Sequence, residues 1–184
     1  MKTLPDYLRP DLDIVLIGLN PSPISVKAGY YYANPRNRFW AALNGSRLID
    51  QPVLPSEAAV RQLFSDHRIG FTDIVKRPTP MGNGLRSADF RKGAVELRQK
   101  LLDYQPHIAW FNGIINYRNY LKYTEPADMP VSFGKQKYQL GRTRFFVTPN
   151  PSPANASYSI EDLIGHYDAL ARYRARLLAR IKGQ

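Results

Sequence analysis

Two copies of the tetrapeptide Asn-Pro-Ser-Pro stand out in this chain, at residues 20–23 and 150–153. Their Asn and Ser side chains supply hydrogen-bond donors and acceptors, and Pro stiffens the loops that carry them, so each copy is suited to holding a polar ligand. Each copy follows an apolar run with the character of a β-strand, at residues 14–19 and 144–149. Ligands of open α/β sheets bind at the carboxyl ends of the strands, so the two segments are predicted to form two walls of one cleft. Either segment alone is also explained as an ordinary turn.

The elements that must position these segments are strands alternating with helices, which predicts an α/β fold with a largely parallel sheet and helices on both faces. Buried strands are expected at 14–19 and 108–112, where short runs are almost continuously apolar. Two paired strands are expected at 133–140 and 144–148. Residues 20–35 are expected to form a long loop, of the kind that is usually functional.

Helices are expected where apolar residues recur at helical spacing after a capping residue. These stretches are 39–43, capped by Asn34 or Asn37, then 56–67, 87–104, a short helix after Gly113 that ends near 121, and 160–182. The apolar residues of the 87–104 helix, which include Phe90, Val95 and Leu101, are expected mostly to face the core. Residues 70–75 are expected to be a turn into a short element, and 78–84 a loop.

The composition favours one folded domain with a polyanionic partner. The 184 residues are enough for one well-buried core, and 43% of them are hydrophobic. The formal net charge is +11, which suggests nucleic acid as the partner, although a generally basic soluble protein has the same balance. The last predicted helix carries a set of cations that forms either a solvated basic face or a secondary DNA contact: Arg172, Arg174, Arg176, Arg180 and Lys182.

The absence of cysteine excludes disulfides, thiolate metal sites, iron–sulfur clusters and cysteine nucleophiles. His67, His107 and His166 lie far apart, without the spacing of metal ligands. The apolar runs near the N-terminus are too short for a signal peptide or a membrane span. We therefore expect a cytoplasmic protein with no membrane partner, associated with the nucleoid if the source is bacterial, and a monomer.

Four sequence blocks, in a fixed order, carry a family resemblance. They are 18–21 with 29–32 and 34–40, then 70–75 with 77–80, then 104–106 with 110–113, and 149–152. Together they resemble the mismatch-specific uracil/thymine DNA glycosylases, within the uracil-DNA glycosylase superfamily. The resemblance implies a three-layer α/β/α sandwich with a central, largely parallel sheet, forming a single DNA glycosylase domain over residues 1–184. It also implies a double-stranded DNA substrate with a mismatched or damaged base, base flipping into the cleft, and no metal or organic cofactor.

The resemblance assigns catalytic roles to Asn20 and Thr79. Asn20 matches the family's catalytic asparagine, whose carboxamide is too weak a base to take a proton but can hold a water against the sugar. Thr79 matches a threonine that helps to hold this water. Asp73 stands where the best-known members have no acidic residue. Its carboxylate is either a general base or stabiliser of the cationic sugar, or a structural brace for the segment that follows.

The resemblance also places residues in the base pocket. Tyr32 lies where the family has the aromatic ring that stacks on the flipped base, and the two preceding tyrosines are expected at the rim or beneath the loop. Backbone groups near Leu19 and Tyr32 are expected to read the pyrimidine edge. Ser22 and Ser25 are expected to line the pocket, where Ser25 would crowd a thymine methyl group and so favour uracil.

The segment 150–156 is expected to enter the minor groove and fill the space that the base leaves. Its predicted DNA-binding residues are Asn150, Pro151, Ser152, Pro153, Ala154 and Asn155. The family often has Gly-Leu or Ala-Arg at positions 153–154, so Ala154 is a poor wedge, and Asn155 is a candidate substitute. Further candidates for phosphate contacts are Lys27, Arg36, Arg38, Lys76 and Arg77.

The predicted activity is that of a monofunctional DNA glycosylase that removes uracil opposite guanine, with thymine and etheno-cytosine as further candidate substrates. No Schiff-base lysine stands out, so lyase activity is not expected. Two other classes stay open. One is a member that binds mismatches or lesions but cleaves weakly, or that prefers other bases such as deaminated purines. The other is a nucleotide- or sugar-handling α/β enzyme, which the absence of a P-loop and of a Gly-x-Gly-x-x-Gly motif makes less favoured.

Overall fold

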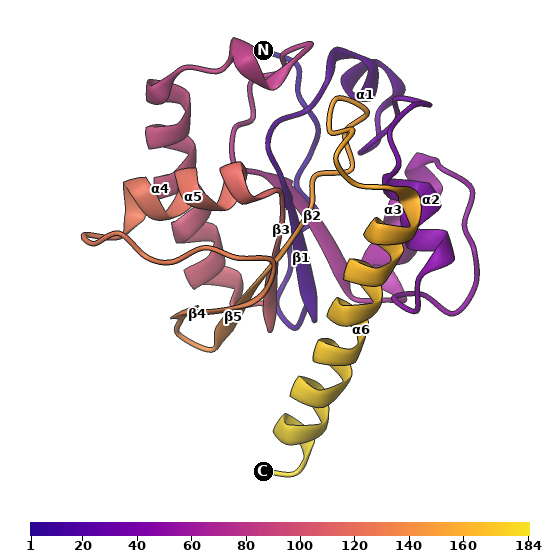
Figure 1. Cartoon of the computed structure of the whole chain (residues 1–184), viewed down its shortest axis with the longest axis vertical. Helices are drawn as coiled ribbons and strands as arrows, with labels where there is room; N and C mark the ends of the chain where they lie inside the picture. Colours follow the sequence, from indigo (N-terminus) through magenta and orange to yellow (C-terminus); the bar gives the residue numbers. More distant parts are fainter.

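The computed structural model describes residues 1–184 and is built around one five-stranded sheet with the strand order β2-β1-β3-β5-β4 (Figure 1). The strands are β1 (Ile14–Gly18), β2 (Ile69–Asp73), β3 (Ile108–Asn112), β4 (Gly134–Leu140) and β5 (Thr143–Thr148). The pairs β1–β2, β1–β3 and β3–β5 are parallel, and only β4 runs antiparallel, against β5. The largely parallel sheet predicted from the sequence is therefore confirmed.

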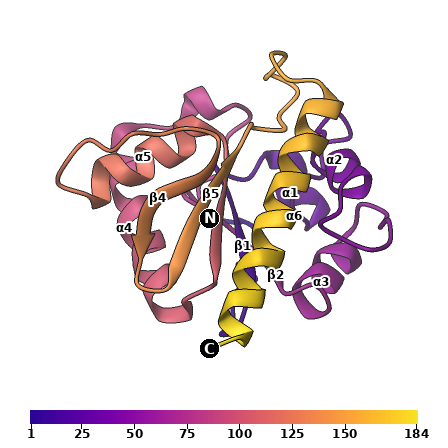
Figure 2. The ribbon, with the colours of Figure 1, turned by 60° about the horizontal axis from the view of Figure 1, so that its bottom comes forward.

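Helices cover both faces of the sheet, so the chain is the three-layer α/β/α sandwich that was expected. The helices are α1 (Pro23–Ala28), α2 (Phe39–Gly45), α3 (Glu57–Ser65), α4 (Ser87–Tyr104), α5 (Ile114–Thr124) and α6 (Ile160–Lys182), with one 3-10 turn at Gly82–Gly84. Helices α4 and α5 lie on one face, and α2, α3 and α6 on the other (Figures 1 and 2). None of them is long and apolar enough to cross a bilayer.

The central strand β1 shows why the apolar runs form buried strands. Alternate side chains of a strand point to opposite faces. Ile14 and Leu16 pack into the core under α2, α3 and α6, while Val15 and Ile17 pack into the core under α4 and α5. All four are fully buried, so a strand in this position must be apolar at every residue.

Two sequence expectations at the edge of the cleft are wrong. Residues 20–35 are not loop throughout, because they contain α1, which Ser22 caps by accepting a hydrogen bond from the Ser25 backbone N–H, with Pro23 at the first helical position. Residues 70–75 are expected to be a turn into a short element, but Ile69–Asp73 is strand β2, which pairs with β1 over its whole length, so residues 70–73 are strand and not turn. Gly70 and Asp73 are of residue types that are depleted in strands, so the sequence does not indicate a strand here, and the pairing with β1 establishes it.

The remaining differences are local. Val95 is 55% exposed, so it lies on the solvent side of α4 and not in the core as expected. Helix α2 follows Arg38, yet the predicted Asn37 still accepts a hydrogen bond from the first-turn N–H of Phe39. Helix α3 ends at Ser65, before the predicted end at residue 67. The predicted Ser159 start of α6 is confirmed as a reciprocal capping box with Asp162.

The N-terminal residues form an arm along the β2 edge of the sheet. Tyr7 makes an isolated antiparallel bridge to Phe71 of β2. The side chains of Leu4 and Tyr7 are also buried in the core under α2, α3 and α6. The arm thereby brings residues 3–6 close to the carboxyl end of β2, where the candidate site lies.

Candidate active site

A polar cleft of about 650 Å³ opens at the carboxyl ends of the parallel strands. Both Asn-Pro-Ser-Pro segments line it, the first through Asn20, Pro21 and Ser22 and the second through Asn150, Ser152 and Pro153. The cleft is completed by side chains at the ends of two further strands, Asp73 of β2 and Asn112 of β3. The structure thus brings to one place segments that are 130 residues apart in the sequence.

The side-chain amide of Asn20 is held in one orientation. Its Nδ2 donates to the backbone carbonyl of Arg77 at 2.9 Å and to Thr79 Oγ1 at 2.7 Å. A carbonyl oxygen can only accept, so this pairing fixes which end of the amide is the nitrogen. Thr79 Oγ1 in turn donates to the carbonyl of Met81 at 2.7 Å. Asn20 Oδ1 therefore stays as the acceptor that the amide offers to the cleft.

Asp73 is a buried carboxyl group at the end of β2, 4% exposed. Burial raises its pKa to about 7, and the negative charge of Asp6 adds to the rise while Lys76 opposes it. Its Oδ2 has no hydrogen-bond partner in the protein and lies 3.8 Å from Lys76 Nζ. A carboxyl group with this pKa exchanges its proton near neutral pH.

The neighbouring strand makes room for this carboxyl group by having no side chain. Gly18 of β1 pairs with Asp73 in the parallel register. A Cβ atom at residue 18 would lie 2.5 Å from Asp73 Oδ1 and 3.2 Å from the Tyr32 hydroxyl. Any residue other than glycine would therefore displace the carboxyl group.

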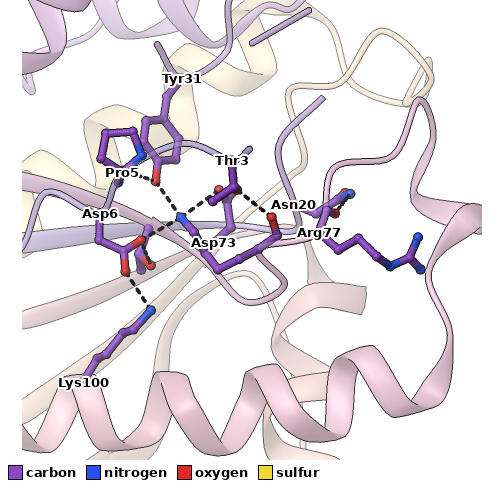
Figure 3. A network of polar contacts seen from close by, with 10 residues as sticks. Thr3, Pro5, Asp6, Asn20, Tyr31, Asp73, Arg77 and Lys100 are labelled. Atoms are coloured by element: carbon purple, nitrogen blue, oxygen red, sulfur yellow. Dashed lines mark hydrogen bonds and ion pairs between the residues drawn. The ribbon is translucent and has the colours of Figure 1, made fainter. Parts of the chain in front are cut away.

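Asp6 of the N-terminal arm binds the ammonium group of Lys76, which lies beside Asp73 (Figure 3). Asp6 accepts hydrogen bonds from Lys76 Nζ and Lys100 Nζ, each at 2.7 Å, and from Thr72 Oγ1 at 2.8 Å. Burial alone would raise the pKa of Asp6, but Lys76 and Lys100 outweigh it and lower that pKa. Since Asp6 binds Lys76 at 2.7 Å and Asp73 is 3.8 Å away, the cation is held mainly by the arm.

The aromatic ring of Tyr32 lines the pocket next to this carboxyl group. The Tyr32 ring packs on Phe39 with a centroid distance of 4.3 Å, and its hydroxyl accepts a hydrogen bond from Asn112 Nδ2 at 2.9 Å. Burial raises the pKa of Tyr32, and the charge of Asp73 raises it further, so the phenol stays neutral. Its backbone φ of 57° is in the left-handed region, which the flanking contacts must hold in place.

Asn112 is a site residue to which the sequence analysis gave no role. It is 2% exposed, and its Oδ1 accepts a hydrogen bond from Thr148 Oγ1 at 3.1 Å, which in turn accepts from Trp110 Nε1 at 2.8 Å. This chain of bonds fixes the Asn112 amide. The signal in the sequence was a single polar residue at the end of an otherwise apolar strand, ahead of a glycine.

With this geometry in place, the comparison with known families is decisive. The family model of the Uracil DNA glycosylase superfamily matches residues 5–171. The chain belongs to this superfamily. A solution NMR structure from Methanosarcina acetivorans, described as a putative uracil DNA glycosylase, has the same fold, with a TM-score of 0.58 and 20% sequence identity over 95% of this chain and 98% of that one. Membership supports a general role in hydrolysing N-glycosidic bonds of DNA.

In this glycosylase-superfamily chain, the predicted pocket serines are tied into the local backbone. Ser22 Oγ caps α1 and donates to Ser25 Oγ at 3.1 Å. Ser25 Oγ also accepts from the backbone N–H of Ala33 at 3.1 Å, so it closes the loop that carries Tyr32. Leu19 lines the cleft, and its carbonyl accepts from the Val75 backbone N–H at 3.0 Å.

The predicted DNA-binding loop is braced from beneath by Arg38. Its guanidinium donates to the carbonyls of Ser152, Asn155 and Tyr158. Its backbone N–H donates to the carbonyl of Pro151, which is buried and does not line the cleft. The geometry thus assigns Arg38 to holding the loop.

Two of the other candidate phosphate contacts are similarly engaged within the protein. Lys76 is bound by Asp6, and Arg77 forms an ion pair with Asp89 at 2.6 Å. Of the predicted set, Arg36 lines the cleft and is exposed. It is therefore the member of the set best placed to meet a phosphate.

The tip of the loop consists of Pro153 and Ala154, which are exposed at the cleft. Asn155, the candidate substitute for the wedge, is half-buried, and its Nδ2 donates to the Asn150 carbonyl at 3.0 Å. Asn150 Oδ1 accepts from the Ser152 backbone N–H at 2.9 Å. The exposed side chains with which the tip of the loop lines the cleft are therefore the small apolar pair at 153–154.

Proposed function

We propose that this protein is a monofunctional DNA glycosylase of the mismatch-specific uracil/thymine type. It acts on double-stranded DNA, takes up uracil, and secondarily thymine or etheno-cytosine, opposite guanine, and leaves an abasic site. The observation that carries the proposal is the fixed amide of Asn20, whose Nδ2 is held by Arg77 and Thr79 so that Oδ1 is free to accept a hydrogen bond from water. The proposal treats the chain as one glycosylase domain that acts as a monomer.

In the proposed reaction, the base is flipped into the cleft and packs against Tyr32, which Phe39 supports from behind. The C1′–N1 bond breaks, its electron pair leaves with the base, and positive charge develops on the sugar. A water held by Asn20 Oδ1 adds its oxygen to C1′. Its proton passes to the carboxylate of Asp73, whose pKa of about 7 suits a general base at neutral pH.

Thr79 has a positioning role in this scheme. Thr79 is 5% exposed, and its hydroxyl accepts from Asn20 Nδ2 and donates to the carbonyl of Met81. Its proton is therefore committed to the protein, and its contribution is to orient Asn20. We expect replacement of Thr79 by Val to reduce the rate by releasing the amide, without changing the affinity for DNA.

The test is base release in a single turnover from a labelled duplex with uracil opposite guanine, at low salt. Wild type, Asn20→Ala and the matched control Asn83→Ala are compared, because Asn83 also lines the cleft but is exposed. Release by wild type and Asn83→Ala that collapses in Asn20→Ala supports the proposal. Full activity of Asn20→Ala contradicts it.

The second candidate is a lesion-binding member with weak cleavage or a different base preference, and the small tip at 153–154 favours it. Duplexes with thymine, etheno-cytosine and hypoxanthine, assayed beside uracil, separate the two. Binding to every duplex without release, at excess protein, would identify the binding member. Release confined to hypoxanthine would identify a glycosylase for deaminated purines.

A further inference from the structure

A second cavity, of about 710 Å³, lies at the opposite end of the strands from the candidate active site. His107, directly before β3, and Arg144, near the start of β5, both line it, so it sits at the amino ends of the parallel strands. The strands place it roughly 17 Å or more from the cleft, at about 3.3 Å per residue. We call it the basic groove.

Cations converge on the basic groove from the β4–β5 hairpin and from α6, which are separate in the sequence. They are Lys135 of β4, Arg142 of the β4–β5 turn, Arg144 of β5, and Arg176 and Arg180 of α6. No Asp or Glu lines the groove, and none of these five cations forms an ion pair. Figure 2 shows α6 passing across the sheet beside β4 and β5, with its C-terminal end free.

One aromatic side chain on the groove wall, that of Tyr173, lies close to several of these cations. Tyr173 stacks on Phe146 and lies 5.8 Å from Lys135 Nζ. Burial raises the pKa of Tyr173, and the charges of Arg144, Arg180 and Arg176 act against the rise. Like charges gathered around one concave surface repel each other, so they are favourable only when an anion joins them. A solvated basic face has no such convergence, because its cations spread along one element.

We propose that the basic groove binds the sugar–phosphate backbone of DNA, as a second contact separate from the duplex segment held by the active-site cleft. Double-stranded DNA carries about one negative charge per 1.7 Å of its axis, so a groove with several unpaired cations can engage several phosphates at once. Such contacts read no sequence and add affinity on long DNA.

Helix α6 links the two sites. It begins beside the loop that borders the cleft and ends at the groove (Figure 1). With 23 residues it spans roughly 34 Å, about the length of one turn of duplex. Because the cleft and the groove lie at opposite ends of the strands, a short duplex held in the cleft is expected to leave the groove empty, whereas a bent flank or another segment of a long duplex can contact it. The effect of the groove is therefore expected to depend on DNA length.

The test compares a groove variant, Arg144→Gln/Arg176→Gln/Arg180→Gln, with a control that removes three cations from α4 and α5, Lys92→Gln/Arg118→Gln/Lys122→Gln. The control residues are exposed on the other face of the sheet. The affinity of the full chain for an undamaged 40-base-pair duplex is measured as a function of salt. We expect the slope of log affinity against log salt to fall by about 3 in the groove variant, at about 0.9 per lost phosphate contact, and by less than about 1 in the control.

Base release from a saturating 12-base-pair uracil duplex is measured in parallel and is expected to be unchanged in the groove variant. Equal loss of slope in both variants would overturn the proposal, since it would show only a general cationic field. Loss of affinity for the 12-base-pair duplex equal to that for the 40-base-pair duplex would also overturn it, because the cations would then serve the cleft.

Inorganic tripolyphosphate distinguishes DNA from a small anion as the ligand of the groove. Saturable binding of tripolyphosphate that the groove variant loses, with an unchanged slope for DNA, would make the groove a small-anion site and refute the proposal. If Arg144→Gln impairs folding, the double variant Arg176→Gln/Arg180→Gln is used, because both side chains are exposed on α6, and a fall of about 2 is expected. The salt slope needs no catalysis, so it decides the matter even if no base is released.

Discussion

Replacing Asp6 by Asn should shift the pH dependence of base removal toward acid, although Asp6 lies on the N-terminal arm and outside the cleft lining. Asp6 Oδ1 holds Lys76 Nζ at 2.7 Å, while Asp73 Oδ2 is 3.8 Å from the same nitrogen (Figure 3). In the wild type the negative charge of Asp6 raises the pKa of Asp73, and the variant removes this charge. The variant also frees Lys76 and Lys100, whose positive charges lower the pKa of Asp73. All of these changes favour the ionised carboxylate.

The magnitude follows from the distance that Lys76 can move. Closing the gap to Asp73 Oδ2 from 3.8 Å to about 2.8 Å strengthens the attraction by about 1.5 kcal/mol at an effective dielectric constant of about 20, which is about one pH unit. A general base works in its ionised form, so the wild-type rate should rise with pH through a midpoint near the Asp73 pKa of about 7. In Asp6→Asn the midpoint should lie about one unit lower.

The assay is single-turnover base release from a saturating uracil–guanine duplex between pH 5 and pH 9, at constant ionic strength. Lys76→Gln should shift the midpoint in the opposite direction, because it removes the cation that lowers the pKa of Asp73. Glu57→Gln is the matched control, since Glu57 pairs with Arg61 on the surface of α3. The tyrosines beside Asp73, Tyr31 and Tyr32, have pKa values raised by burial and stay neutral throughout this range. Identical midpoints in all variants, or a shift toward alkali in Asp6→Asn, would refute the reasoning.

Three further predictions concern the same cleft. Asp73→Asn should slow base release about 10²- to 10⁴-fold with little change in DNA affinity. The raised pKa of Asp73 means that the folded state binds the Asp73 proton more tightly than the unfolded state, so the free energy of unfolding falls as pH rises from 3.8 to about 7. In urea unfolding at pH 8, Asp73→Asn should therefore be more stable than wild type by as much as about 4 kcal/mol. No gain in stability would show that burial does not destabilise the ionised carboxylate. Gly18→Ala places a Cβ 2.5 Å from Asp73 Oδ1, so its release rate should fall toward that of Asp73→Asn, and a wild-type rate would mean that the carboxylate does not act from its observed position. Ala154→Leu enlarges the exposed tip of the loop and should slow dissociation of the abasic product, measured by competition with unlabelled duplex, whereas faster dissociation would argue against insertion of this tip into DNA.

The sequence by itself determined the elements whose signals are local. The continuous apolar runs at 14–18 and 108–112 form buried strands because both faces of each strand are covered. Helix α6 starts at a capping box that can be recognised from Ser159 and Asp162 alone. The two Asn-Pro-Ser-Pro segments lie at one cleft because both follow parallel strands, whose carboxyl ends meet at the same edge of the sheet.

Only the tertiary structure decided the features that arise from distant neighbours. Strand β2 contains Gly70 and Asp73, which are of residue types depleted in strands, so its identification depends on its pairing with β1. The protonation of Asp73 depends on burial beside Gly18 and on a lysine that Asp6 holds from 70 residues away in sequence. The basic groove joins cations from β4, β5 and α6 that no stretch of sequence shows together. Charge, burial and pKa are set by distance in space, and a linear sequence leaves those distances unspecified until the chain has folded.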